Sequence, residues 1–220
     1  MALRFLISGT GPGCGKTMVG CALAFAFKVR AMRVGVMKPV ATGCHERDGM
    51  LVSHDAEALR AAASCDDAPE LISPYRYRSG MAPYAQEAGD GSLPERARIH
   101  DAYLRISADR EVMIVEETDG LAAPICSGWS FADMAHSFGL ELIVVAANQP
   151  GFVGATALIR DYAKRRQIPV RGVILNSLTP EASSSVRANA EILTRAVGIR
   201  FLGAVRFKEP LSLAIVEGLL

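Results

Sequence analysis

The sequence predicts an α/β fold of three layers, with a mostly parallel central sheet covered by helices on both faces. Short apolar runs, typical of strands that are buried on both faces, recur along the chain. Helical patterns lie between these runs, as the crossovers between parallel strands require. A glycine-rich loop follows the first apolar run and leads into a helical pattern. Ligands of such sheets bind beyond the carboxyl ends of the strands, so residues there are the first functional candidates.

The expected elements alternate along the whole chain, and no domain boundary is evident. Strands are predicted at the apolar runs 3–8, 33–40, 112–115, 142–147, 172–175 and 201–205. Helices are predicted between them at 15–31, 55–63, 94–106, 131–138, 154–166 and 181–197. We therefore expect a single domain over residues 1–220.

Composition favours a small-molecule ligand and a cytoplasmic location. Lysine and arginine number 24 against 23 acidic residues, so the net charge of +1 gives no reason to expect nucleic acid or a membrane surface as partner. The five cysteines are odd in number and form no C-x-x-C pair, which fits reduced thiols better than disulfides or zinc. The glycine loop and Lys16 interrupt the apolar N-terminal segments, so we expect neither a signal peptide nor a membrane span there.

The segment from Gly9 to Thr17 has the pattern of a phosphate-binding loop. Glycines let successive backbone N–H groups surround phosphate oxygens, Lys16 neutralises the phosphates, and the Thr17 hydroxyl ligates Mg²⁺. Thr10 stands where the strict spacing places the first glycine, so the loop is a variant. The alternative is a glycine-rich turn with an incidental Lys-Thr pair, which the flanking strand and helix disfavour. The sequence thus predicts a P-loop NTPase-like fold that binds a nucleoside triphosphate.

Lys38 and Thr42 follow the second predicted strand, at the edge where the glycine loop also emerges. An ammonium group there is suited to stabilise charge on a transferring phosphoryl group, although a surface lysine that caps the strand fits the pattern too. Thr42 and Gly43 either offer polar groups to a substrate or form a turn.

Two carboxylates are candidates for holding Mg²⁺ opposite the loop. Glu116 ends an apolar strand, which is the arrangement of metal carboxylates in nucleotide-hydrolysing folds. Glu117 and Asp119 are close enough to compete for that role. Asp55 begins a helical pattern and is either a metal-directed carboxylate or an ordinary helix-terminal acid.

Together these motifs resemble the dethiobiotin synthetase family. The resemblance is carried by G-T-x-x-x-x-G-K-T at 9–17, K-P-V-A-T-G at 38–43, Asp55, M-A-P at 81–83 and V-E at 115–116. It implies an ATP-dependent cyclo-ligase of biotin biosynthesis, a homodimer that uses ATP, Mg²⁺, CO₂ or bicarbonate, and 7,8-diaminononanoate. The resemblance also implies that Lys16 and Lys38 offset the charge of the phosphoryl group during catalysis.

The resemblance implies a role for each matching residue. Lys38 is the catalytic lysine, Thr42 contacts the diamine, and Asn176 reads the adenine. The residues expected to surround the ATP phosphates are Gly13, Cys14, Gly15, Lys16, Thr17 and Met18. The residues expected to hold Mg²⁺ are Thr17, Asp55 and Glu116. From the residues alone, a polar cap at a strand end is the preferred explanation of Asn176.

The chain departs from the family pattern at two loops. The usual E-G-A-G-G is replaced by E-E-T-D-G at 116–120, and residues 151–155 lack the asparagine expected to contact the substrate carboxylate. A divergent ATP-binding relative with another substrate is therefore an alternative. A switch ATPase that acts as a dimer is a second alternative, but its K-G-G-x-G-K loop would need a lysine where this chain has Gly11.

Overall fold

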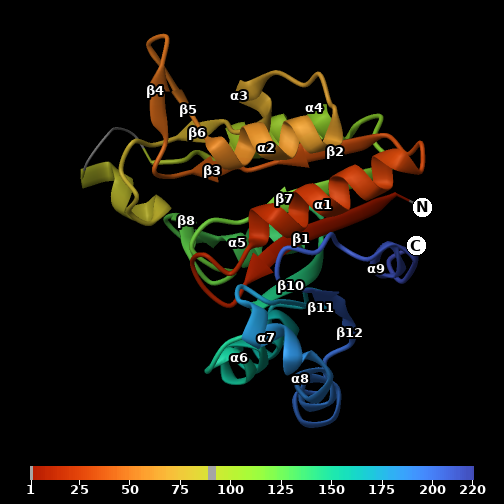
Figure 1. The fold of residues 1–220 in the computed structure, drawn as a ribbon. Helices are drawn as coiled ribbons and strands as arrows, with labels where there is room; N and C mark the ends of the chain where they lie inside the picture. Colours follow the sequence, from red (N-terminus) through yellow and green to blue (C-terminus); the bar gives the residue numbers. More distant parts are fainter. Residues whose placement is uncertain (1, 89–92) are drawn as a thin grey trace.

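A six-stranded parallel sheet forms the centre of the fold in the computed structural model, which describes residues 2–88 and 93–220 (Figure 1). The strand order is β12-β11-β10-β1-β7-β2, and every neighbouring pair is parallel. The strands are β1 (Leu3–Gly9), β2 (Val34–Met37), β7 (Val112–Glu116), β10 (Glu141–Ala147), β11 (Val170–Asn176) and β12 (Phe201–Val205). The predicted parallel sheet is confirmed.

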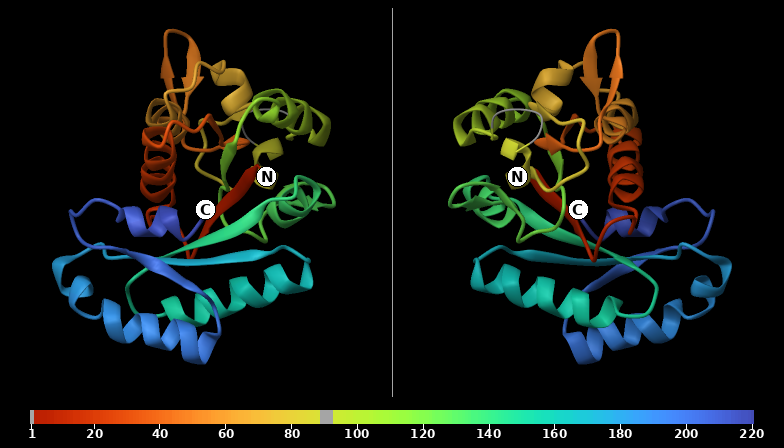
Figure 2. Two further views of the ribbon diagram at one scale, coloured as in Figure 1. Left: turned by 90° about the vertical axis from the view of Figure 1, so that its right-hand side faces the viewer. Right: turned by 90° about the vertical axis from the view of Figure 1, so that its left-hand side faces the viewer.

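Helices cover both faces of this sheet, which completes the three predicted layers (Figure 2). One face carries α1 (Lys16–Val29), α2 (His54–Ala63) and α9 (Leu213–Glu217), and the other carries α4 (Arg96–Ser107), α5 (Phe131–Ser137) and α6 (Phe152–Arg165). Val19, Leu23 and Phe27 follow each other at helical spacing on α1 and are fully buried. The ring of Phe27 stacks on that of Phe5 in β1, so this apolar stripe fixes α1 on the sheet.

Shorter elements lie in the connections. Three pairs of short strands are β3 (Val40–Ala41) with β6 (Tyr75–Arg76), β4 (His45–Arg47) with β5 (Met50–Val52), and β8 (Pro124–Cys126) with β9 (Trp129–Ser130). The remaining helical segments are α3 (Pro69–Ile72), the 3₁₀ helix η1 (Pro83–Ala88), α7 (Pro180–Ser184), α8 (Val186–Ile192) and the π-helical turn η2 (Leu193–Val197).

Two predicted elements are wrong as continuous segments. The strand expected at 33–40 ends at Met37 and resumes as β3 in a separate small sheet, because Pro39 has no N–H to donate and the Lys38 N–H bonds to Ile72 instead. The helix expected at 181–197 breaks between α7 and α8, where the Ala182 carbonyl accepts hydrogen bonds from the Ser185 hydroxyl and the Asn148 amide.

The sheet brings the ends of β1, β2 and β7 together. Ile7 lies opposite Glu116, and Met37 lies opposite Val115, so the segments that follow these three strands start at the same edge. The glycine loop, Lys38 and Glu116 are adjacent for this reason. In the described part of the chain, no helix has the length and apolar character needed to cross a membrane.

Candidate active site

The glycine loop connects β1 to α1 in a conformation that depends on glycine. Gly15 immediately precedes α1 and has a φ of 95°, and a Cβ there would lie 2.1 Å from Asn176 Nδ2. Asn176 donates from that same nitrogen to the Cys14 carbonyl at 2.9 Å. Thr10, the departure from strict spacing, accepts the Ala147 N–H through its hydroxyl and ties the loop to β10. The loop is therefore held in place by two neighbouring strands.

Lys38 lies in a buried cluster at the end of β2. Its Nζ is 2.9 Å from Asp55 Oδ2 and 2.5 Å from Glu116 Oε1, and only 5% of the residue is exposed. Thr17, in the first turn of α1, donates its hydroxyl to the same Glu116 oxygen at 2.9 Å. The cluster thus joins one residue each from α1, α2, β7 and the segment after β2.

The charges in this cluster determine each other's protonation. Burial alone would lower the pKa of Lys38, but the carboxylates of Glu116 and Asp55 outweigh it and raise the pKa. Burial alone would raise the pKa of Asp55, but the Lys38 ammonium outweighs it and holds the pKa below its usual value. Burial raises the pKa of Glu116, which the neighbouring ammonium offsets only in part. Lys38 is therefore a persistent cation at the mouth of the loop.

The residues present fit a divalent cation that a nucleotide brings with it. Glu116 Oε2 is buried and has no hydrogen-bond partner among the residues that the structure describes. In residues 2–88 and 93–220, no group of three or more His, Cys, Asp or Glu side chains is arranged to hold a metal. Mg²⁺ is usually held by one or two carboxylates together with phosphate oxygens and water, so Thr17, Asp55 and Glu116 meet its needs without a dedicated cage.

Adjacent residues at the end of β7 serve different partners. Whereas Glu116 faces Thr17 and Lys38, the carboxylate of Glu117 lies 3.5 Å from Lys16 Nζ. Successive side chains of a strand point to opposite faces, which explains the separation. Of the two, Glu116 alone reaches Thr17, and sequence reasoning missed that Glu117 contacts the loop lysine.

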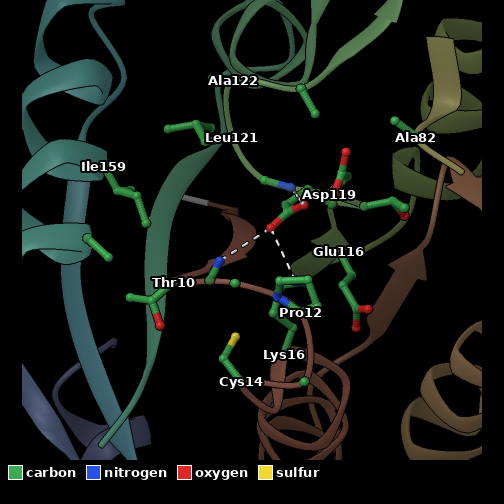
Figure 3. A pocket seen from close by; sticks show the side chains of 18 of the residues that line it. Thr10, Pro12, Cys14, Lys16, Ala82, Glu116, Asp119, Leu121, Ala122 and Ile159 are labelled. Carbon is green, nitrogen blue, oxygen red and sulfur yellow. Dashed lines mark hydrogen bonds and ion pairs between the residues drawn. The ribbon is translucent and has the colours of Figure 1, made fainter. Parts of the chain in front are cut away.

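These groups open into one pocket of about 930 Å³ (Figure 3). The side formed by residues 9–17 with Lys38, Asp55 and Glu116 is called the phosphate side here. The α6 side is formed by Ala155, Leu158, Ile159, Asp161, Tyr162 and Arg165. Residues 118–123 and Met81–Ala82 also line the pocket, and Figure 3 shows Lys16 and Ile159 on different sides of this space.

Proteins of known family align with nearly the whole length of this chain. The AAA domain family matches residues 4–214. The protein named ATP-dependent dethiobiotin synthetase BioD from Anaeromyxobacter dehalogenans is 33% identical over 207 residues, which cover 94% of this chain and 87% of that protein. The chain belongs to the dethiobiotin synthetase family. Synthetases with the same name from Aromatoleum aromaticum and Rhodopirellula baltica are 32% and 31% identical, covering 91% and 94% of this chain and 89% and 85% of their own lengths.

Two solved structures have the same fold as this chain. The septum site-determining protein MinD from Pyrococcus horikoshii, complexed with Mg-ADP, has a TM-score of 0.51 at 16% identity. A ParA family ATPase from Chlorobium tepidum has a TM-score of 0.54 at 18% identity. The alignments cover 99% of this chain and 86% and 89% of the two structures. Identities this low show the fold alone, which confirms the predicted P-loop NTPase-like architecture of this dethiobiotin synthetase family member.

Most residues predicted for the site lie at the pocket of this dethiobiotin synthetase family member. Met18 and Asn176 do not line the pocket in the described structure. Met18 is 47% exposed on α1, and Asn176 is buried against the loop. The assigned roles of all these residues remain predictions. Those that line the pocket are Gly13, Cys14, Gly15, Lys16, Thr17, Lys38, Thr42, Asp55 and Glu116.

Proposed function

We propose that this chain is an ATP- and Mg²⁺-dependent dethiobiotin synthetase. The observation that carries the proposal is the convergence of Lys16 and Lys38, two ammonium groups, on one pocket with Thr17, Asp55 and Glu116. Phosphoryl transfer needs positioning and charge stabilisation more than covalent chemistry, and this is what the cluster offers. The synthetase relatives, which span nearly the whole chain, support the same assignment.

The proposed reaction carboxylates a diamine and closes a ring. One amine of 7,8-diaminononanoate takes up CO₂ as a carbamate, and a carbamate oxygen attacks the γ-phosphorus of ATP and displaces ADP. The second amine then attacks the carbamoyl carbon of this carbamoyl phosphate-type intermediate, and phosphate leaves as the ureido ring closes. The nucleophiles come from the substrate, so the protein's task is to hold the reactants in line.

The charged side chains have separate tasks in this scheme. Lys16 offsets charge on the β- and γ-phosphates, while Lys38 offsets the charge that moves onto the transferring group and the ADP oxygen. Thr17, Asp55 and Glu116 would hold Mg²⁺, which supplies further charge neutralisation at the phosphates. The buried ion pairs of Lys38 fix its ammonium before substrate arrives, so little reorganisation is needed during transfer.

The rest of the pocket would receive the diamine. Thr42 lines the pocket and is proposed to contact an amine or the carbamate, while the apolar side chains of the α6 side suit an alkyl chain. We further propose that the chain works as a single cytoplasmic domain that assembles into a homodimer and takes small molecules, with neither nucleic acid nor membrane as a partner.

ADP release with ATP, Mg²⁺ and bicarbonate, measured with and without 7,8-diaminononanoate, tests the proposal. We expect the diamine to stimulate ADP release and a product with the mass of the cyclic urea to accumulate. ATP binding without diamine-dependent release or that product would overturn the synthetase assignment. If the rate of ADP release per protein molecule instead rose with protein concentration and did not respond to the diamine, the dimer-switch ATPase would be the better description.

A further inference from the structure

Glu117 is a fully buried carboxylate that contacts the end of β1 and the lysine of the phosphate-binding loop. Its Oε1 accepts the Ser8 hydroxyl at 3.2 Å and the Gly9 N–H at 3.3 Å, and its Oε2 accepts the Gly120 N–H at 2.5 Å. The Lys16 Nζ lies 3.5 Å from the same Oε1, which makes the two side chains an ion pair. One side chain thus connects the end of β1, the loop lysine and the segment after β7.

The partners of Glu117 and Lys16 are unequal. A buried carboxylate is stabilised by the hydrogen bonds that it accepts as well as by a countercharge, and three neutral donors hold Glu117 whether or not Lys16 is near. In contrast, Glu117 is the one carboxylate at ion-pair distance from Lys16 within the described residues. The carboxylate therefore keeps its three donors when Lys16 changes partner. Lys16 can reach a ligand in the pocket, because it lines the pocket and 13% of its side chain is exposed.

We propose that Glu117 is a positioning residue that holds Lys16 as its counter-ion in the nucleotide-free protein and yields it to the phosphates of ATP. This inference rests on the proposed binding of ATP at the loop. The carboxylate remains in place on Ser8, Gly9 and Gly120 after the exchange. The contact keeps Lys16 and the loop ordered when no nucleotide is bound. Because ATP must compete with a fixed negative charge for Lys16, the contact also lowers the affinity for ATP.

Glu117→Gln separates the charge from the packing. The amide retains the volume and an oxygen for Ser8 and Gly9, and it loses the countercharge for Lys16 and the acceptor for Gly120. We expect the Kd for MgATP, measured by titration calorimetry, to fall about tenfold. The Kd for AMP should stay within about twofold, because AMP lacks the β- and γ-phosphates that Lys16 reaches.

Asp119→Asn is the matched control. Asp119 belongs to the same segment, lines the pocket and has a φ of 71°, a conformation that asparagine tolerates well. The substitution removes the same charge from the same loop without touching the Lys16 contact. A purely general effect of negative charge would tighten ATP binding in both variants, whereas the proposal predicts a clear change in Glu117→Gln alone.

A second measurement uses the unmodified protein, so the test does not depend on the folding of a variant. The Gly120 amide should exchange its hydrogen equally slowly with and without saturating MgATP, because Glu117 keeps its acceptor position when Lys16 leaves. An unchanged or weaker ATP affinity in Glu117→Gln, equal tightening in the Asp119→Asn control, or faster Gly120 exchange with ATP would each overturn the proposal. Ring closure is not a readout here, so failure of the diamine reaction would count against the proposed synthetase and leave this test decisive.

Discussion

The two sides of the pocket are built in opposite ways. On the phosphate side, Lys38 and Glu116 are 5% and 1% exposed and are held by ion pairs that exist without any ligand. On the α6 side, Leu158 is 73% exposed, and its neighbours Ile159 and Tyr162 are only partly buried. The protein fixes the groups for phosphoryl chemistry in advance and presents an open surface for the rest of the substrate.

This difference separates two kinds of mutational effect. A buried charge on the phosphate side both stabilises the fold through its partners and acts on the nucleotide, so its loss changes stability and activity together. A partly exposed apolar residue on the α6 side has few partners to lose, so its replacement should alter the binding of one substrate and little else.

The largest effect should come from Lys16→Ala on the phosphate side. Lys16 is the loop cation that reaches the β- and γ-phosphates, and the loss of its charge-assisted contacts should raise the Kd for MgATP by on the order of a hundredfold and abolish turnover. Titration calorimetry and ADP release check this. Lys28→Ala is the control, because Lys28 lies in the last turn of the same helix and contacts Ser64, and it should leave both values unchanged.

Lys38→Met should mainly lower kcat. The methionine keeps most of the side-chain volume but removes the ammonium, and we expect kcat to fall by about a hundredfold with a smaller change in KM for ATP. Because Glu116 then keeps a buried carboxylate without its cation, the melting temperature should fall as well. A raised KM for ATP with an unchanged kcat would place Lys38 in ground-state binding and contradict a role in phosphoryl transfer.

The sequence predicted the phosphate side well because its signals are local. Gly15, Lys16 and Thr17 are contiguous, and Lys38 and Glu116 each follow an apolar run, so topology alone brings them together. The same logic located the six strands of the sheet to within a few residues. Their meeting at one edge follows from parallel pairing and needs no knowledge of side-chain contacts.

What the sequence did not predict depends on tertiary contacts or on weak local signals. The partner of Glu117 depends on the direction in which its side chain leaves the end of β7, and adjacent acids leave that open. The break after α7 depends on Asn148, a residue distant in sequence. The hairpin of β4 and β5 did carry a turn signal in the dipeptide Asp48-Gly49, whose residues both adopt positive φ, but each flanking strand is only three residues long.

A smaller effect, at the base of the loop, should come from Asn176→Ala. The Cys14 carbonyl would lose its donor at 2.9 Å, which should cost about 1–2 kcal/mol of unfolding free energy. If the residue also reads the adenine, as the family resemblance implies, the preference for ATP over GTP should fall severalfold in titrations. Asn148→Ala, a buried asparagine after the neighbouring strand, should lose similar stability and keep the nucleotide preference. A preserved preference in Asn176→Ala would reduce its role to holding the loop.

The smallest effect should come from the α6 side and complete the contrast. Leu158→Ser removes apolar surface that lines the pocket, so KM for 7,8-diaminononanoate should rise about threefold to tenfold, while the Kd for MgATP and the melting temperature stay nearly constant. Leu104→Ser is matched to it, because Leu104 is a 52% exposed leucine on α4 that is not part of the pocket lining, and it should change none of these values. If Leu158→Ser also weakened ATP binding, the two sides of the pocket would be coupled. The open surface would then belong to the same preorganised unit as the buried charges.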